Sequence, residues 1–251
     1  MATVAVLADP PVEEFVLPEL VDGTPLSAAE ATELYNAMLT DICRAVTASG
    51  ADLLVNYRDS EQVPGDVDSE QELRTVLSDR LDDAGQIRYE VQVGETFAGR
   101  AGNTATHLLE TEDERSVVVV EPTTPFLGRQ QIGSAAMKIR NSDVVLGPAS
   151  DGRVYFAGFS TGIDFDDAYA PPALETLTDR ARDADLSVDF LPQETVVETP
   201  RDLADAVTQI RSRLRAQRNV PVETATVVDE LGLYAEASDD GLAVARASDS
   251  S

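Results

Sequence analysis

An acidic turn lies between two apolar runs near the middle of the chain. Residues 143–159 contain an apolar run, a Gly-Pro turn that begins at Gly147, the pair Asp151-Gly152 and a second apolar run. In mixed α/β proteins, polar groups at strand ends are where ligands usually bind. An Asp-Gly pair between apolar runs is also an ordinary hairpin signal. Spacing alone favours the hairpin, so Asp151 is a candidate site residue only together with other strand ends.

Glycines between positions 94 and 102 have the spacing of a phosphate-binding loop between a strand and a helix. Helix N-termini receive anions, because their backbone N–H groups are unpaired. However, Arg100 and Ala101 stand where such a loop needs Lys and Ser or Thr, and Ala101 has no hydroxyl for magnesium. The sequence therefore excludes a P-loop NTPase. It leaves Arg100 as either a phosphate contact or a surface arginine.

Two polar residues follow residues 116–120, the clearest candidate for a central strand. Glu121 and Thr123 come after this strand, and prolines stand at 122 and 125. The carboxyl ends of parallel strands face the ligand crevice, so either residue could contact a metal or a ribose. A simple strand exit stiffened by the two prolines is the somewhat favoured alternative.

Other reactive residues carry weaker signals. Asp164, Asp166 and Asp167 could offer carboxylates to a divalent ion, but with 46 acidic residues such spacings arise easily by chance. His107 and Cys43 stand in expected helices, without the sequence partners of a triad, a reactive thiol or a zinc site. Cys43 is the only cysteine, which excludes a disulfide within the chain.

Hydrophobic periodicity predicts strands alternating with helices, which would position these residues. Ser27 and Glu30 form a capping box for a helix that Gly50 ends. The alternation predicts an α/β protein with a mostly parallel sheet and helices on both faces, in which the 143–159 hairpin is antiparallel. Strands are expected at 3–8, 52–57, 87–93, 116–120, 143–146, 153–159 and 186–191. Further helices are expected at 69–82, 128–140, 172–183 and 200–218. A short helix that follows the glycine-rich loop is expected to end at 109, and a loop is expected from 9 to 25.

The charge balance is extreme. The 251 residues include 46 acidic and 19 basic side chains, a net charge of -27, and only one of the basic residues is a lysine. Nucleic acids and anionic membranes need a basic face, so neither is an expected partner. We hypothesise adaptation to molar salt, where the screening length falls to about 3 Å and dense like charge costs little. No apolar run approaches a membrane span and no signal-peptide pattern begins the sequence, so a cytoplasmic location is expected.

Taken together, segments over about residues 3–205 resemble a family of largely uncharacterised proteins in the nucleotide-diphospho-sugar transferase superfamily. Phospholactate and molybdenum-cofactor guanylyltransferases are its more distant relatives. The most specific match is the family's Val-Val-Leu-Gly-Pro-Ala-x-Asp-Gly, which is similar to residues 144–152. Weaker matches in the same order are 97–100 with Leu-Gly-x-Arg, 117–125 with a strand ending in Ser-Asp-Ser-Pro, and 198–203 with Asp-Thr-x-x-Asp-Leu.

The resemblance implies a GT-A-like three-layer α/β/α sandwich and a site for a nucleoside triphosphate or a nucleotide-sugar. It also implies Mg²⁺ or Mn²⁺, which would neutralise charge on a diphosphate leaving group. Asp151 would then be the catalytic residue, as a metal or acceptor contact, and Arg100 would contact phosphate. Gly147 and Gly152 would allow close backbone approach, and Glu121 could supply a missing carboxylate.

The chain departs from the family pattern in three places. The family's basic stretch after the first strand is an acidic one here, beginning at Asp9, which is kept as a candidate substrate contact. The family's metal-binding aspartate aligns with Thr123, a poor magnesium ligand. The family also has an Asp-Gly-Gly-Tyr motif, whose second Gly and Tyr are replaced in this chain by Arg153 and Val154. The fold therefore transfers more securely than the activity.

Two functions remain open from the sequence. The first is a nucleotidyl- or glycosyltransferase. The second is a catalytically degenerate member that binds a nucleotide, a metabolite or a protein partner. Residues 1–220 are expected to form the GT-A-like domain, and residues 221–251 a C-terminal extension that is loosely ordered from about 238. The sequence does not indicate an oligomeric state.

Overall fold

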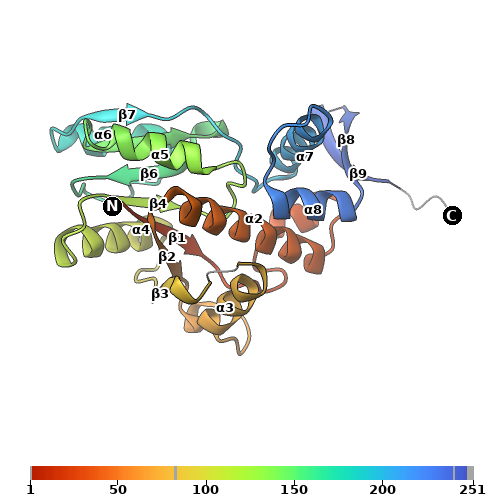
Figure 1. Ribbon diagram of the computed structural model, residues 1–251, viewed down its shortest axis with the longest axis horizontal. Coiled ribbons are helices and arrows are strands. Elements are labelled where there is room, and N and C mark those ends of the chain that lie inside the picture. Colours follow the sequence, from red (N-terminus) through yellow and green to blue (C-terminus); the bar gives the residue numbers. More distant parts are fainter. Residues whose placement is uncertain (1, 82–83, 240, 248–251) are drawn as a thin grey trace.

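A seven-stranded sheet lies between layers of helices in the computed structural model, which describes residues 2–81, 84–239 and 241–247 (Figure 1). The strand order is β3-β2-β1-β4-β6-β5-β7. The strands are β1 (Thr3–Ala8), β2 (Asp52–Tyr57), β3 (Arg88–Val91), β4 (Val117–Val120), β5 (Val144–Pro148), β6 (Val154–Phe159) and β7 (Val188–Phe190). β6 runs antiparallel to β4 and β5, and the other pairs are parallel. The expected α/β fold with a mostly parallel mixed sheet is confirmed.

The sheet reverses its strand order at β1. The chain passes from β1 to β2 and β3 on one side and then returns to place β4 on the other side. Side by side, β1 and β4 pair in parallel, with Val4 opposite Val118 and Val6 opposite Val120. In open α/β sheets, a crevice for ligands forms at the carboxyl ends of the strands at such a switch point.

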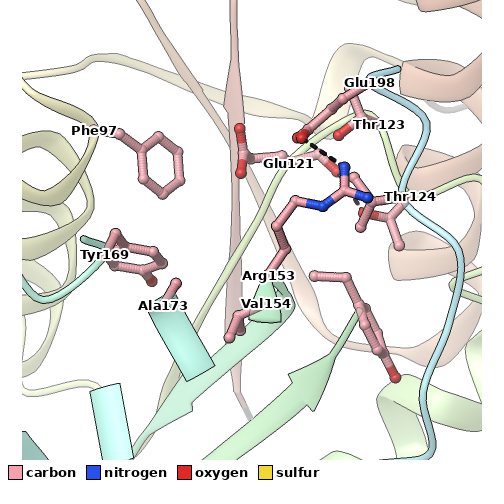
Figure 2. Close-up of a pocket in the computed structure, with 11 residues that line it drawn as sticks. Phe97, Glu121, Thr123, Thr124, Arg153, Val154, Tyr169, Ala173 and Glu198 are labelled. Atoms are coloured by element: carbon pink, nitrogen blue, oxygen red, sulfur yellow. Dashed lines mark hydrogen bonds and ion pairs between the residues drawn. The ribbon is translucent and has the colours of Figure 1, made fainter. Parts of the chain in front are cut away.

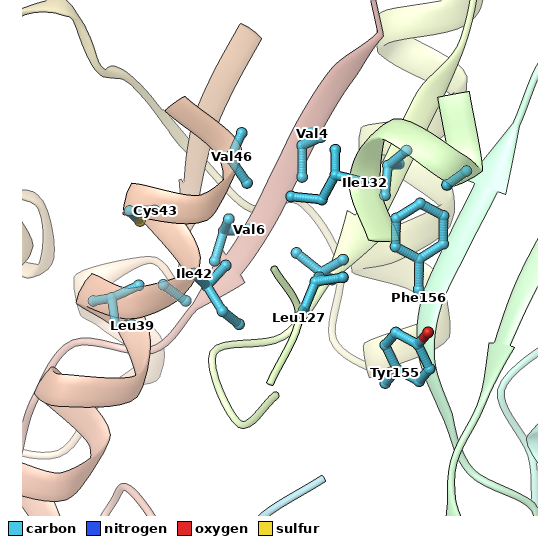
Figure 3. Packing of buried hydrophobic residues seen from close by; sticks show 14 of the residues in the cluster. Val4, Val6, Leu39, Ile42, Cys43, Val46, Leu127, Ile132, Tyr155 and Phe156 are labelled. Atoms are coloured by element: carbon cyan, nitrogen blue, oxygen red, sulfur yellow. The ribbon is translucent and has the colours of Figure 1, made fainter. Parts of the chain in front are cut away.

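Alternate side chains of the central strands supply two separate cores. Val4 and Val6 of β1 pack with α2 (Ala28–Ser49), α3 (Ser69–Arg80) and α5 (Arg129–Lys138) on one face (Figure 3). Ala5 and Leu7 pack with α4 (Phe97–Thr106) and α6 (Ala173–Asp183) on the other face. All residues of β1 and β4 are buried, which is the pattern of strands covered on both faces.

The sequence signals for α2 are realised in atomic detail. The Ser27 hydroxyl accepts a hydrogen bond from the Glu30 N–H at 3.3 Å, and the Glu30 carboxylate accepts one from the Ser27 N–H at 2.8 Å. Gly50 ends the helix in the left-handed conformation, with φ of 80°. This long helix covers the face of the sheet on which Val4 and Val6 lie, and it also forms part of a third core.

The third core joins α1 (Pro18–Gly23) and α2 to the C-terminal elements α7 (Pro200–Arg215), α8 (Val222–Glu230), β8 (Leu233–Ser238) and β9 (Gly241–Arg246) (Figure 1). β8 and β9 form an antiparallel hairpin. Loose order was expected from about 238, whereas 241–246 pair with β8, and Arg246 contacts Glu30 at 2.8 Å. The remaining part of that prediction, residue 240 and residues 248–251, lies outside the described residues.

Several short elements differ from the sequence expectation. The predicted loop over 9–25 contains α1, which begins with Pro18 at its first position, where the missing N–H costs nothing. The glycine-rich segment forms a loop only up to Thr96, because the Thr96 hydroxyl accepts a hydrogen bond from the Gly99 N–H and starts α4. No helix among the described residues is both long and apolar enough to cross a membrane.

Candidate functional site

Two cavities lie at the carboxyl ends of β1 and β4, next to the start of β6. The first, of about 150 Å³, lies between Phe97 and Tyr169 on one side and Arg153 and Glu198 on the other (Figure 2). The second, of about 290 Å³, lies between the end of β1 and the segment that leads to α1. Glu121, Thr123 and Glu198 line both cavities, so the two spaces adjoin at these residues.

Glu121 lies where the cavities meet, directly after β4. Among the described residues, no hydrogen-bond donor contacts its carboxyl group. Burial, reinforced by the negative charges of Glu198 and Asp9, raises the pKa of Glu121 to about 8, against the opposing effect of Arg100 and Arg153. A carboxyl group whose pKa lies near neutral pH can exchange a proton with a ligand, and such groups cluster at functional sites.

Thr123 and Tyr169 present buried hydroxyl groups to the site. Neither the Thr123 Oγ1 nor the Tyr169 hydroxyl oxygen has a hydrogen-bond partner within the described part of the chain. The Thr123 carbonyl accepts a hydrogen bond from the Val197 N–H at 2.7 Å, which fixes the loop after β4. Tyr169 packs edge-on against Phe97, with ring centroids 4.8 Å apart. Buried polar atoms without a partner are uncommon and suit contacts to a bound ligand.

Asp9, after β1, lines the second cavity beside an arginine. The Arg58 guanidinium binds the Asp9 carboxylate through two nitrogens, with Nη2 at 3.2 Å from Oδ2. The Asp9 N–H donates to the Tyr35 hydroxyl at 2.8 Å, which fixes the backbone at this strand end. Phe15 lies under the Arg58 guanidinium, and Leu17 takes a left-handed conformation with φ of 51°. The wall of this cavity therefore combines aromatic and apolar side chains with four acidic residues, Asp9, Glu19, Glu121 and Glu198, and Arg58 pairs with the first of them.

Arg153 is fixed from several sides in the first cavity. Its Nη1 donates to Glu198 and to Asp202 at 2.9 Å each, and its Nη2 donates to the other Asp202 oxygen at 2.8 Å. Its Nε donates to the Ser150 carbonyl at 3.1 Å. Asp202 also caps α7 through Thr199, and Arg153 holds the pKa of the Asp202 carboxyl below its usual range against the effect of burial.

Arg100 is buried close to the site without lining either cavity. Its side chain is 5% exposed, and Nη1 donates to the Glu95 carbonyl at 3.0 Å. Its Nε has no partner among the described residues. Burial, together with the nearby Arg58 charge, lowers the pKa of Arg100. The residue is therefore not the surface arginine that the sequence left open, and its role as a phosphate contact stays a prediction.

The structure does not bring Asp151 into either of these cavities. Its side chain is 88% exposed on the short turn Ser150–Gly152, and its carboxylate lies 3.9 Å from Arg153 Nη2. A Cβ at Gly147 would lie 2.6 Å from the Tyr155 ring, and one at Gly152, where φ is 70°, would lie 2.7 Å from Pro172. Protein packing therefore accounts for both glycines, and the turn matches the hairpin alternative.

The carboxylates around the cavities do not fit a divalent ion as they stand. Arg58 binds Asp9, Arg153 binds Glu198 and Asp202, and burial raises the pKa of Glu121 to about 8. Mg²⁺ needs ionised oxygen ligands that are free to coordinate it. The expected Mg²⁺ or Mn²⁺ therefore has no ready set of ligands here.

One metal-like cluster exists elsewhere in the described ranges. Glu90, His107 and Glu112 place ligand atoms within 4.8 Å of one another, but Arg88 binds both glutamates. Asp164, one of three aspartates considered from the sequence, pairs with Arg180 at 3.2 Å. Ion pairs therefore account for the glutamates of the first group and for Asp164.

Sequence reasoning did not select several residues of the site. Arg153 and Glu198 stood in the compared motifs, as a departure and as a match, so closer attention to these positions could have found them. Arg58 follows the second strand, a position equivalent to that of Asp9. Phe97 and Tyr169 carry no local signal, because they meet only through the fold.

The fold defines a class: α/β proteins with the architecture of nucleotide-diphospho-sugar transferases. A putative nucleotide-diphospho-sugar transferase from Desulfovibrio desulfuricans is similar to this chain with a TM-score of 0.74 and 20% identity, over 92% of this chain and 95% of that one. A cytidylyltransferase from Leptospira borgpetersenii is similar with a TM-score of 0.50 and 8% identity, over 92% and 94%. At these identities the likeness concerns the fold.

Within this class, residues 47–169 match the family described as "Uncharacterized protein conserved in bacteria (DUF2064)". This range contains β2 to β6 and both polar segments, Glu121–Thr123 and the 143–159 hairpin. The expected resemblance to an uncharacterised family with this fold is confirmed. No curated protein matches the chain in sequence.

Proposed function

We propose that the protein binds a nucleoside triphosphate or a nucleotide-sugar in the joined cavities and transfers a nucleotidyl or glycosyl group. The observation that supports this most is the meeting of the two cavities at Glu121, Thr123 and Glu198, at the switch point between β1 and β4. This is where open α/β sheets bind ligands, and a pocket with converging polar groups and a perturbed pKa is the expected form of such a site.

Each cavity suits one part of such a ligand. Phe15, Leu17 and Tyr35 give the second cavity apolar and aromatic walls, which suit a base. The first cavity offers the hydroxyls of Thr123 and Tyr169. Arg100 and Arg153 lie close to Glu121, and a diphosphate would share Arg153 with Glu198 and Asp202, which already bind it.

Glu121 is the residue that we assign to proton transfer. In its ionised form it would accept the proton of an acceptor hydroxyl as that oxygen attacks the donor. The bond that breaks would release pyrophosphate in nucleotidyl transfer, or the nucleotide in glycosyl transfer, beside Arg153. A general base is most effective when its pKa lies near the working pH, which is the case for Glu121.

A second function, binding without turnover, is favoured by two observations. Arg153 is held by Asp202 and Glu198, and Thr123 stands where the resembling family has an aspartate. A site altered in this way could keep its affinity for a nucleotide and lose the transfer step.

Thermal unfolding with a panel of nucleoside triphosphates and nucleotide-sugars tests binding, and detection of product by mass spectrometry separates the two functions. A ligand at 100 times its Kd stabilises the folded state by about 2.7 kcal/mol, which gives a visible shift in Tm. A shift with product supports a transferase, and a shift without product supports a binding protein. The absence of any shift across the panel would contradict both.

A further inference from the structure

Two carboxylates of the site converge on a single cation that belongs to the chain itself. Glu198 lies just before α7 and contacts the Arg153 guanidinium from the start of β6 (Figure 2). Asp202, in the first turn of α7, contacts the same guanidinium. The three contacts measure 2.8 to 2.9 Å. Charge-assisted hydrogen bonds of this length are among the strong ones, and the two bonds to Asp202 form the bidentate pattern that an arginine makes with a carboxylate.

The guanidinium also stands in the volume that a cation would need. Arg153 and Glu198 both line the first cavity, so a metal ion that binds Glu198 and Asp202 together would have to displace Arg153 from them. Displacement would leave the arginine partly buried without its partners, and a buried charge without partners is costly. The Nε bond to Ser150 further fixes the side chain.

The geometry points to a built-in cation: Arg153 takes the place between Glu198 and Asp202 that a divalent metal ion would otherwise occupy, and the site holds its anionic ligand without such an ion. The first part depends only on the contacts of Arg153. The second part rests on the proposed function, because it assumes that the ligand is a nucleotide or nucleotide-sugar.

A manganese titration followed by electron paramagnetic resonance tests the first part. The titration is carried out in high salt, which suppresses diffuse binding to the acidic surface. Arg153→Gly frees the Glu198 carboxylate and the Asp202 oxygen that binds no backbone N–H group. It is expected to gain one Mn²⁺ ion, bound roughly tenfold or more tightly than any ion on the wild type. Adding Glu198→Gln to that variant should remove the ion, and Arg153→Lys, which keeps a cation, should not gain it.

Two results would overturn the built-in cation. One is a wild-type Mn²⁺ ion that is lost in Glu198→Gln, since it would show that a metal binds beside Arg153. The other is an Arg153→Gly variant that is folded by circular dichroism and gains no ion. If Arg153→Gly does not fold, the Mn²⁺ titration of the wild type against Glu198→Gln still decides the question.

The nucleotide panel tests the second part. The Tm shift that a ligand gives in EDTA should equal the shift with Mg²⁺ or Mn²⁺, and a shift that requires the metal would overturn metal-independent binding. The absence of a shift under every condition would count against the proposed function itself. The manganese titration would still decide the role of Arg153, because it uses no nucleotide.

Discussion

At the scale of single residues, Glu121 couples the site to the stability of the protein. Its pKa of about 8 in the folded state exceeds that of an ordinary carboxyl group. Its contribution to the free energy of unfolding is therefore favourable at low pH and is lost as the pH rises through about 8. Glu121→Gln stays neutral at every pH. We expect this variant to be more stable than the wild type at pH 8 by a few kcal/mol, while losing turnover by a factor of about 10² to 10⁴.

Urea unfolding of both proteins at pH 5 and pH 8 measures this difference, which should be smaller at pH 5. Glu95→Gln is a suitable control, because Glu95 is exposed and its substitution should change the unfolding free energy by less than about 0.5 kcal/mol at either pH. Equal stability of Glu121→Gln and wild type at both pH values would contradict the assignment.

At the scale of elements, α8 depends on a group from a distant helix. The Asp41 carboxylate of α2 accepts hydrogen bonds from the N–H groups of Glu223 and Thr224, at 3.1 and 2.8 Å, and from the Thr224 hydroxyl at 2.8 Å. Asp41→Ala leaves these buried donors unpaired and should lower the unfolding free energy by about 1–3 kcal/mol in urea. Asp229→Ala, which alters an exposed residue of the same helix, is the control. If Asp229→Ala lowers the unfolding free energy as much as Asp41→Ala does, the capping role of Asp41 is contradicted.

This capping pattern explains what the sequence could and could not predict. α2 was predicted with its capping box and its final glycine, because Ser27, Glu30 and Gly50 are local signals. The cap of α8 lies 183 residues away from Thr224, and Arg153 meets Asp202 across 49 residues. Contacts of this kind leave no local pattern. For the same reason, Glu121 was predictable as a candidate at a strand end, whereas the pairing of Arg153 with Glu198 and Asp202 was not.

At the scale of the whole molecule, the net charge of -27 sets the conditions in which the fold is stable. Adaptation to molar salt remains our proposal. Self-repulsion destabilises a compact acidic protein at low ionic strength and is screened as salt is added. We expect the Tm to rise steadily from low salt to molar KCl. An unchanged or falling Tm over this range would contradict the proposal.

We propose that the ligand binds where the two cavities meet, and Thr123→Val is the variant that tests this placement. The Thr123 hydroxyl is buried without a partner in the described structure, so valine, of nearly the same shape, should leave the fold intact and remove one contact to the ligand. In a calorimetric titration with the nucleotide that the panel selects, we predict affinity about tenfold weaker for Thr123→Val. Affinity should be unchanged for Asp151→Ala, and the reverse pattern would contradict the account.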